Sequence, residues 1–132
     1  MIHPSLFLRR AIMLDAIVSG AVGLLLAIDA GMLAPMLNLP EALLREIGLF
    51  YIVYAALVGW LGTRPSMPKA LVSIVIAGNV AFTAGSIALL LSGAVAPNLL
   101  GQAFIASQGI ATAAFAELQY IGLRRSSGAA AA

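Results

Sequence analysis

Apolar residues fill four long stretches of the chain, and short segments rich in proline, asparagine or charge separate them. At a rise of about 1.5 Å per residue, roughly 20 helical residues cross a bilayer core of about 30 Å. We therefore predict an all-α fold, an antiparallel four-helix bundle integral to a membrane. It forms one domain over residues 1–125, followed by a flexible tail at 126–132. The predicted spans are 11–34, 41–62, 69–93 and 98–123.

The breaks between these spans are marked by proline. Ala34-Pro35 is predicted to close the first span, and Pro40 suits the first turn of the second. Two prolines and two cations mark residues 63–69 as a loop, and Pro97 with Asn98 marks residues 94–98 as the last turn. The two resulting hairpins are similar enough to leave an internal duplication open.

The cations indicate an orientation. Six of the seven Lys and Arg residues lie before the first span, between the second and third spans, or after the fourth span: Arg9, Arg10, Arg64, Lys69, Arg124 and Arg125. Because cytoplasmic loops carry an excess of cations, we expect both termini and the central loop in the cytoplasm. The first stretch is longer than a signal-peptide core and carries Asp15, so we expect it to be retained as a span.

The composition excludes most classes of soluble protein. The chain is 62% hydrophobic and 9% charged, too few charges to cover the surface of a soluble domain, and its net charge of +2 does not indicate nucleic-acid binding. It has no cysteine and one histidine, which excludes thiol chemistry and the common cysteine or bis-histidine metal sites. No catalytic motif is present. We expect neither an enzyme nor a bound cofactor or metal.

Small residues recur at helical spacing in three of the spans, as in Ala16, Gly20, Gly23, Ala27 and Gly31. In lipid, such stripes let helix backbones approach closely. They serve packing inside one bundle or self-association, and the sequence does not select between these uses.

Two acids inside the predicted spans are candidate functional residues. Asp15 follows Arg10 by five residues and Glu117 precedes Arg124 by seven, which places both one to two turns inside the cytoplasmic face. One interpretation pairs them with the terminal arginines as a structural ion cluster. The other is an ion- or proton-handling pair, because two inward carboxylates in low dielectric repel and one then keeps its proton near neutral pH. Asp29 is expected at the outer rim, in water or beside Arg45.

A second candidate site is a polar layer near the middle of the predicted spans, formed by Tyr54, Asn79, Ser107 and Gln108. Amides and phenols at this depth need partners, because the bilayer core holds no water to satisfy them. The layer is either a set of interhelical hydrogen bonds or the lining of a small polar pocket.

The pattern resembles small four-span bacterial inner-membrane proteins, a largely uncharacterised group. The resemblance rests on Leu14-Asp15-Ala16 with Ser19-Gly20, on Leu39-Pro40 before Leu43-Leu44-Arg45-Glu46-Ile47-Gly48, on Asn79, and on the run from Leu118 to Arg125. It covers nearly the whole chain and implies a membrane fold rather than an activity.

For function we predict a non-enzymatic accessory protein that recognises a membrane-complex partner, or further copies of itself, helix to helix. Its loops are too short to recognise a soluble partner. The alternative is a small dimeric transporter or channel for a cation, a proton or a hydrophobic compound, using Asp15 and Glu117. A lipid- or quinone-binding module is a third possibility. A cavity that reaches Asn79 and Gln108, or a dry core there, would separate these hypotheses.

Overall fold

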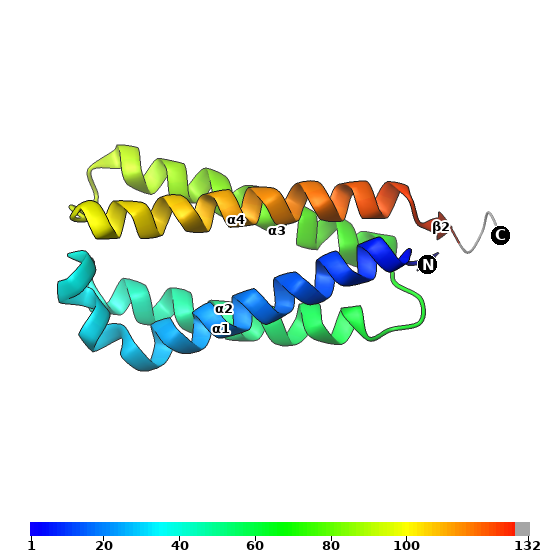
Figure 1. Cartoon of the computed structure of the whole chain (residues 1–132), viewed down its shortest axis with the longest axis horizontal. Helices are drawn as coiled ribbons and strands as arrows, with labels where there is room; N and C mark the ends of the chain where they lie inside the picture. The colour runs from blue at the N-terminus through cyan, green and yellow to red at the C-terminus, as the bar shows by residue number, and fades with distance from the viewer. Residues whose placement is uncertain (129–132) are drawn as a thin grey trace.

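A computed structural model describes residues 1–128, which form four long helices. They are α1 (Leu6–Leu37), α2 (Glu41–Gly62), α3 (Lys69–Ser92) and α4 (Leu99–Arg124), and two short strands, β1 (Ile2–His3) and β2 (Ser127–Gly128), flank them. The predicted all-α bundle is confirmed (Figure 1). Each helix is long and apolar enough to cross a membrane, as in a multi-pass membrane protein.

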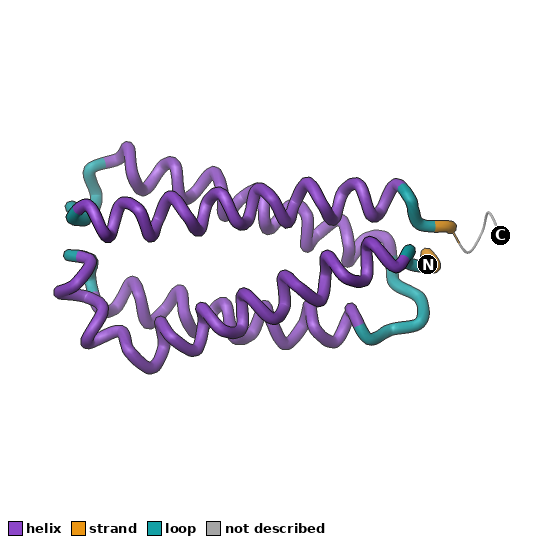
Figure 2. The backbone as a smooth tube through the Cα atoms, in the orientation of Figure 1, coloured by secondary structure: helices purple, strands orange, loops and turns teal. Residues whose placement is uncertain are grey.

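Successive helices run in opposite directions and form two hairpins, α1–α2 and α3–α4 (Figure 1). The hairpins meet mainly where α1 packs against α4, whereas α2 and α3 make little direct contact. The two short strands and the α2–α3 loop lie at one end of the bundle, which we call the terminal end; the other two loops lie at the opposite, far end (Figure 2).

The first helix is longer than predicted. Ser5 caps it, because its side-chain oxygen accepts a hydrogen bond from the backbone N–H of Leu8, so α1 begins five residues before the expected position. It also continues through Pro35 instead of closing there. The backbone leaves helical geometry at Asp29, a kink in the stretch that precedes the proline.

The terminal end is held by backbone pairing. Strands β1 and β2 pair antiparallel, and Ile2 also exchanges two backbone hydrogen bonds with Met67 of the α2–α3 loop, at 2.7 and 2.9 Å. Part of the tail predicted to be flexible is thus ordered: Ser126 also bonds to the Gly122 carbonyl at 2.7 Å. Residues 129–132 lie outside the described part of the chain.

Asparagines join the two loops at the far end. The Asn98 side chain donates to the Met36 carbonyl at 2.8 Å, and the Asn38 side chain donates to the Ala96 carbonyl. Asn38 itself has a left-handed backbone, φ 54°, which ends α1. Both ends of the bundle are therefore closed by contacts between its two hairpins.

Two apolar clusters form the core, one toward each end of the bundle. On α2, Val58 belongs to the terminal-end cluster and Tyr51 to the far-end cluster. Tyr54 lies between them, and Asn79 follows the last α3 residue of the terminal-end cluster, Val75, by one turn. Polar side chains thus occupy the level between the two clusters.

Candidate functional site

A single buried carboxylate, Asp15 of α1, brings all four helices together. Its side chain is 1% exposed. One oxygen, Oδ1, accepts a hydrogen bond from the Ser19 hydroxyl at 2.9 Å. The other, Oδ2, accepts from the Tyr54 hydroxyl at 2.8 Å, from Asn79 Nδ2 at 3.0 Å and from Gln119 Nε2 at 2.8 Å. We call these five residues the Asp15 network.

The network closes on itself. Asn79 Nδ2 donates a second hydrogen bond to Gln119 Oε1 at 3.0 Å, so the two amides and Asp15 Oδ2 form a ring. Two hydroxyl groups and two amide groups thus surround the carboxyl group. In the described part of the chain, no buried side-chain nitrogen or oxygen lacks a partner. Every fully buried polar side-chain atom at this level is therefore hydrogen-bonded.

Asp15 and Asn79 lie at similar distances from the starts of their helices, which explains why they meet. Asp15 lies nine residues after the start of α1, and Asn79 lies ten residues after the start of α3. At 1.5 Å per residue these positions are about 13 and 15 Å along their helices. Both helices begin at the terminal end, so the two side chains meet. Asp15 is deeper than predicted because α1 begins before Arg9 and Arg10.

No cation partners Asp15, so the expected ion cluster with the terminal arginines is wrong. Across residues 1–128 the one ion pair is Arg45–Glu41 at 2.6 Å, on the exposed start of α2. It also shows that Arg45 pairs with Glu41 and not with Asp29. Arg9 bonds to the Gly62 carbonyl, and Arg124 donates to the Tyr120 hydroxyl at 3.4 Å.

Glu117 lies apart from Asp15, contrary to the inward orientation predicted for it. Its side chain is exposed and lines a shallow hollow on the outer face of α3 and α4. Residues two apart on a helix point to different faces, and Gln119 is the residue that points at Asp15. Ala113, one turn before Glu117 on the same face of α4, is exposed as well.

The predicted polar layer is divided in the structure. Tyr54 and Asn79 belong to the Asp15 network. Gln108 accepts a long hydrogen bond from the Tyr51 hydroxyl, 3.4 Å, nearer the far end. Ser107 takes no part, because it is exposed and bonds to the Phe104 carbonyl of its own helix at 2.7 Å.

Gln119 is the site residue that sequence reasoning missed. The buried face of α4 carries Gly109, Thr112, Ala116, Gln119 and Gly122, at spacings of three and four residues. A polar residue on the same face as small residues was the available signal, since small residues mark the face where helices approach.

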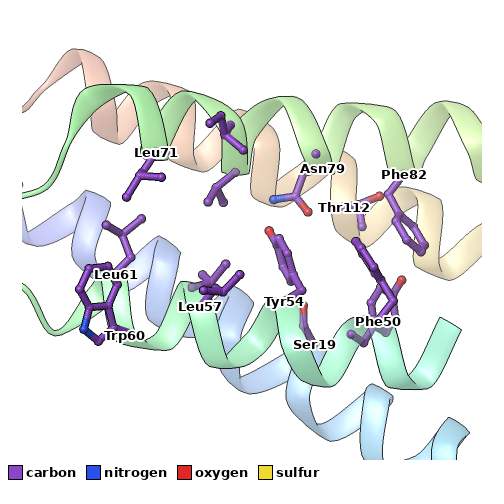
Figure 3. A pocket seen from close by; sticks show the side chains of 15 residues that line it. Ser19, Phe50, Tyr54, Leu57, Trp60, Leu61, Leu71, Asn79, Phe82 and Thr112 are labelled. Carbon is purple, nitrogen blue, oxygen red and sulfur yellow. The ribbon is translucent and has the colours of Figure 1, made fainter. Parts of the chain in front are cut away.

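An elongated groove opens between α2 and α3 beside the Asp15 network. It consists of two adjoining cavities of about 260 and 380 Å³, which share Phe50, Tyr51, Gly78 and Phe82. We call it the α2–α3 groove. The first cavity reaches Ser19, Tyr54 and Asn79; the second reaches Gln108. Figure 3 shows Tyr54 and Asn79 pointing toward each other from opposite walls of the first cavity.

The groove is mostly apolar and aromatic. Leu57, Leu61 and Leu71 line its end nearest the termini, together with Trp60 (Figure 3). Ile74 lines the groove as well. Toward the far end, Phe82 of α3 lies 4.9 Å from Tyr51 and 6.2 Å from Phe50, centroid to centroid, where the two cavities adjoin. Among the polar groups at its walls, Ser19, Tyr54 and Asn79 are hydrogen-bonded to Asp15.

Over residues 1–128, no three His, Asp or Glu side chains gather closely enough to hold a metal ion. Comparison with protein-family models, curated proteins and solved structures finds no match to this chain.

Proposed function

We propose that this is a non-enzymatic multi-pass protein of a bacterial inner membrane, with both termini in the cytoplasm, that binds a hydrophobic small molecule from the bilayer in its α2–α3 groove. The observation that carries the proposal is the groove itself, an apolar and aromatic hollow with a few hydrogen-bonding groups at its walls. The resemblance to small four-span inner-membrane proteins supports the location.

The size and lining of the groove fit a small ligand. Binding sites for small molecules are mostly apolar cavities of about 300–1,000 Å³ with a few placed polar groups. The two adjoining cavities, about 260 and 380 Å³, are of this order. Tyr54 and Asn79 supply the polar groups and are fixed by Asp15, at 2.8 and 3.0 Å. Such a groove has its orienting groups in place before a ligand arrives.

Entry from the side of the bundle fits the packing. Both bundle ends are tied by contacts between the hairpins, such as β1 with β2 and Asn98 with Met36. In contrast, α2 and α3 make little direct contact along their lengths. A molecule dissolved in the lipid therefore reaches the groove without crossing either bundle end.

The single tryptophan of the chain, Trp60, lines the groove and gives a direct readout. Vesicles that contain the full chain are titrated with 1-bromo-4-butylbenzene, whose bromine quenches tryptophan on contact. We expect saturable quenching above the linear background from probe dissolved in the lipid.

Two variants on one helix control this titration. In Gly78→Phe a ring enters the groove, because nothing lies within 4 Å of a Cβ at Gly78. In Ala84→Phe the same ring is added to the opposite, outer side of α3. Loss of saturable quenching in Gly78→Phe alone supports the proposal, and purely linear quenching in the unaltered chain rejects it.

The membrane orientation has its own test. Reporter fusions after Arg125 and within residues 94–98 report on opposite sides of the membrane. We expect cytoplasmic activity at Arg125 and periplasmic activity in the loop. A periplasmic reporter after Arg125 would contradict the proposed topology.

A second candidate is the accessory module that recognises a partner helix to helix. It is favoured by Gly78 and Gly85 of α3, which line the groove and would have no atom within 4 Å of a Cβ added at either position. A helix of a partner, or of a second copy, would find an open small-residue face there. Gentle solubilisation followed by mass measurement tests it, since a strictly monomeric protein argues against it.

The transporter alternative used Asp15 and Glu117 as a pair of carboxyl groups, and this geometry does not favour such a pair. Asp15 is buried in the network, and Glu117 is exposed on the outer face of α4. A proton flux in vesicles that Glu117→Gln abolishes, with unchanged stability, would restore that alternative.

A further inference from the structure

We infer that the α2–α3 groove prefers a hydrophobic cation, such as a quaternary ammonium on an aromatic or alkyl body, over a neutral or anionic molecule of the same shape. The inference rests on the groove being a binding site, as proposed above. It concerns the charge of the ligand, and two separate features of the groove support it.

The first feature is the carboxyl group of Asp15. It has four neutral donors, and the one ion pair of residues 1–128 lies elsewhere, at Arg45–Glu41. These donors satisfy the carboxyl oxygens but supply no counter-charge. A cation in the groove against Tyr54 and Asn79 lies one side chain away from the carboxyl group. Such a cation is attracted by the carboxylate form and favours it.

The second feature is the aromatic lining. The chain has nine aromatic residues, from five Phe, three Tyr and one Trp, and five of them line the first cavity: Phe50, Tyr51, Tyr54, Trp60 and Phe82. The faces of aromatic rings attract cations. One ring already does so, because the Arg64 guanidinium lies 5.5 Å from the Trp60 ring centroid. This lining favours a cation independently of Asp15.

The depth of the polar groups separates this ligand from a lipid headgroup. Tyr54 lies eight residues before the end of α2, about 12 Å along the helix. Lipid ammonium groups remain at the bilayer surface, outside the hydrocarbon core. The occupant we infer is therefore a cation whose hydrophobic body carries it into the core.

Three matched probes test the charge preference. The first is 3-(4-bromophenyl)propyl-trimethylammonium. The second replaces its quaternary nitrogen with carbon, and the third ends in a sulfonate. Each is titrated into choline-lipid vesicles containing the full chain, Trp60 quenching is followed, and concentrations are corrected for measured partitioning into the lipid. We expect the ammonium probe to bind at least about tenfold more tightly than the neutral probe, and the sulfonate more weakly than both.

Asp15→Asn removes the charge, and Glu117→Gln removes one carboxylate charge outside the groove as the matched control. We expect the preference for the ammonium probe to fall to about threefold in Asp15→Asn, the remainder coming from the ring faces, and to stay unchanged in Glu117→Gln. An unchanged preference in a folded Asp15→Asn protein would overturn the role of Asp15.

A second pair of variants serves if Asp15→Asn does not fold. Gly78→Lys places an ammonium in the groove, and Gly78→Met adds a similar length without charge. The preference should disappear with lysine and persist with methionine; equal effects of the two side chains count against the inference.

The outcomes separate this inference from the proposed function. Equal binding of the ammonium and neutral probes to the unaltered chain overturns the inference and leaves the groove as a site for neutral molecules. Absence of saturable quenching by all three probes overturns both.

Discussion

The α1–α2 interface and the α2–α3 groove use glycine in opposite ways. At the α1–α2 interface, a Cβ added to Gly48 would lie 2.8 Å from the Gly23 carbonyl oxygen, and one added to Gly23 would lie 2.9 Å from the Gly48 carbonyl oxygen. On α3, a Cβ at Gly78 or Gly85 would meet nothing within 4 Å. The same residue type lets two backbones touch in one place and leaves space in the other.

The difference shows how the open side of the bundle is held. Close packing joins α1 to α2, whereas α2 and α3 reach each other through Asp15, whose Oδ2 accepts from both Tyr54 and Asn79. Two kinds of side-chain contact thus bridge α2 and α3: the hydrogen bonds to Asp15, and the contacts of the Phe82 ring with Phe50 and Tyr51. The groove lies along these contacts, where the two helix backbones stand apart.

The largest effect is expected from Asp15→Ala, which removes the shared acceptor and leaves four donors unpaired. We expect the free energy of unfolding to fall by about 2–4 kcal/mol, since each buried unpaired group is costly but membrane hydrogen bonds are individually modest. The measurement is SDS-induced unfolding from mild detergent, followed by helical circular dichroism. Glu117→Ala, on the outer face, should change stability by less than about 0.5 kcal/mol. Equal effects at both positions would show that the network does not hold the bundle.

Gly48→Ala tests the packed side of the comparison. Its methyl group would meet backbone atoms of α1, so we expect a loss of about 1–3 kcal/mol in the same unfolding assay. Gly78→Ala is the matched control on the open side, where alanine should raise stability by up to about 1 kcal/mol through its higher helix propensity. Destabilisation by Gly78→Ala would mean that the groove is closed in the folded protein.

Tyr54→Phe removes the donor that links α2 to the network. We expect a loss of about 0.5–1.5 kcal/mol, the usual contribution of one hydrogen bond. Tyr51→Phe is the control, since its hydroxyl lies 3.4 Å from Gln108, at the weak end of hydrogen-bond geometry, and its loss should be smaller. If the two variants are equally stable, the link from α2 to Asp15 contributes nothing measurable.

Ser107→Ala should have the smallest effect. The hydroxyl bonds to a carbonyl of its own helix and is exposed, so we expect a change below about 0.5 kcal/mol. A larger loss would place Ser107 in an interhelical contact that this arrangement does not contain.

The sequence predicted the four helices well because the length and apolarity of each stretch can be read directly from it. The start of α1 was harder to predict. Arg9 and Arg10 resemble the charged edge of a span, although Ser5 caps the helix before them. That shift of more than a turn made Asp15 look shallow, and so made arginine partners plausible. The sequence therefore predicted separate levels for Asp15 and Asn79, which the structure brings together.

It was harder to predict which face of α4 is buried. Ala113 and Ala116 are both small, but the structure exposes the first and buries the second, and Glu117 and Gln119 follow them to opposite sides. A stripe of small residues on a helix rich in alanine does not specify one face. The α2–α3 groove was equally inaccessible, since it depends on how far two helices stand apart, and apolar residues line a groove and a packed interface alike.

The Asp15 network also has a consequence for the order of synthesis. Asp15 enters the membrane with the first helix, and Ser19 is beside it from the start. Tyr54 arrives with α2, Asn79 with α3, and Gln119 only when nearly all of α4 has been made. A chain halted before Gln119 therefore holds Asp15 without one of its two amide partners, and the hydrogen-bonded ring of Asp15, Asn79 and Gln119 is completed only by the last helix.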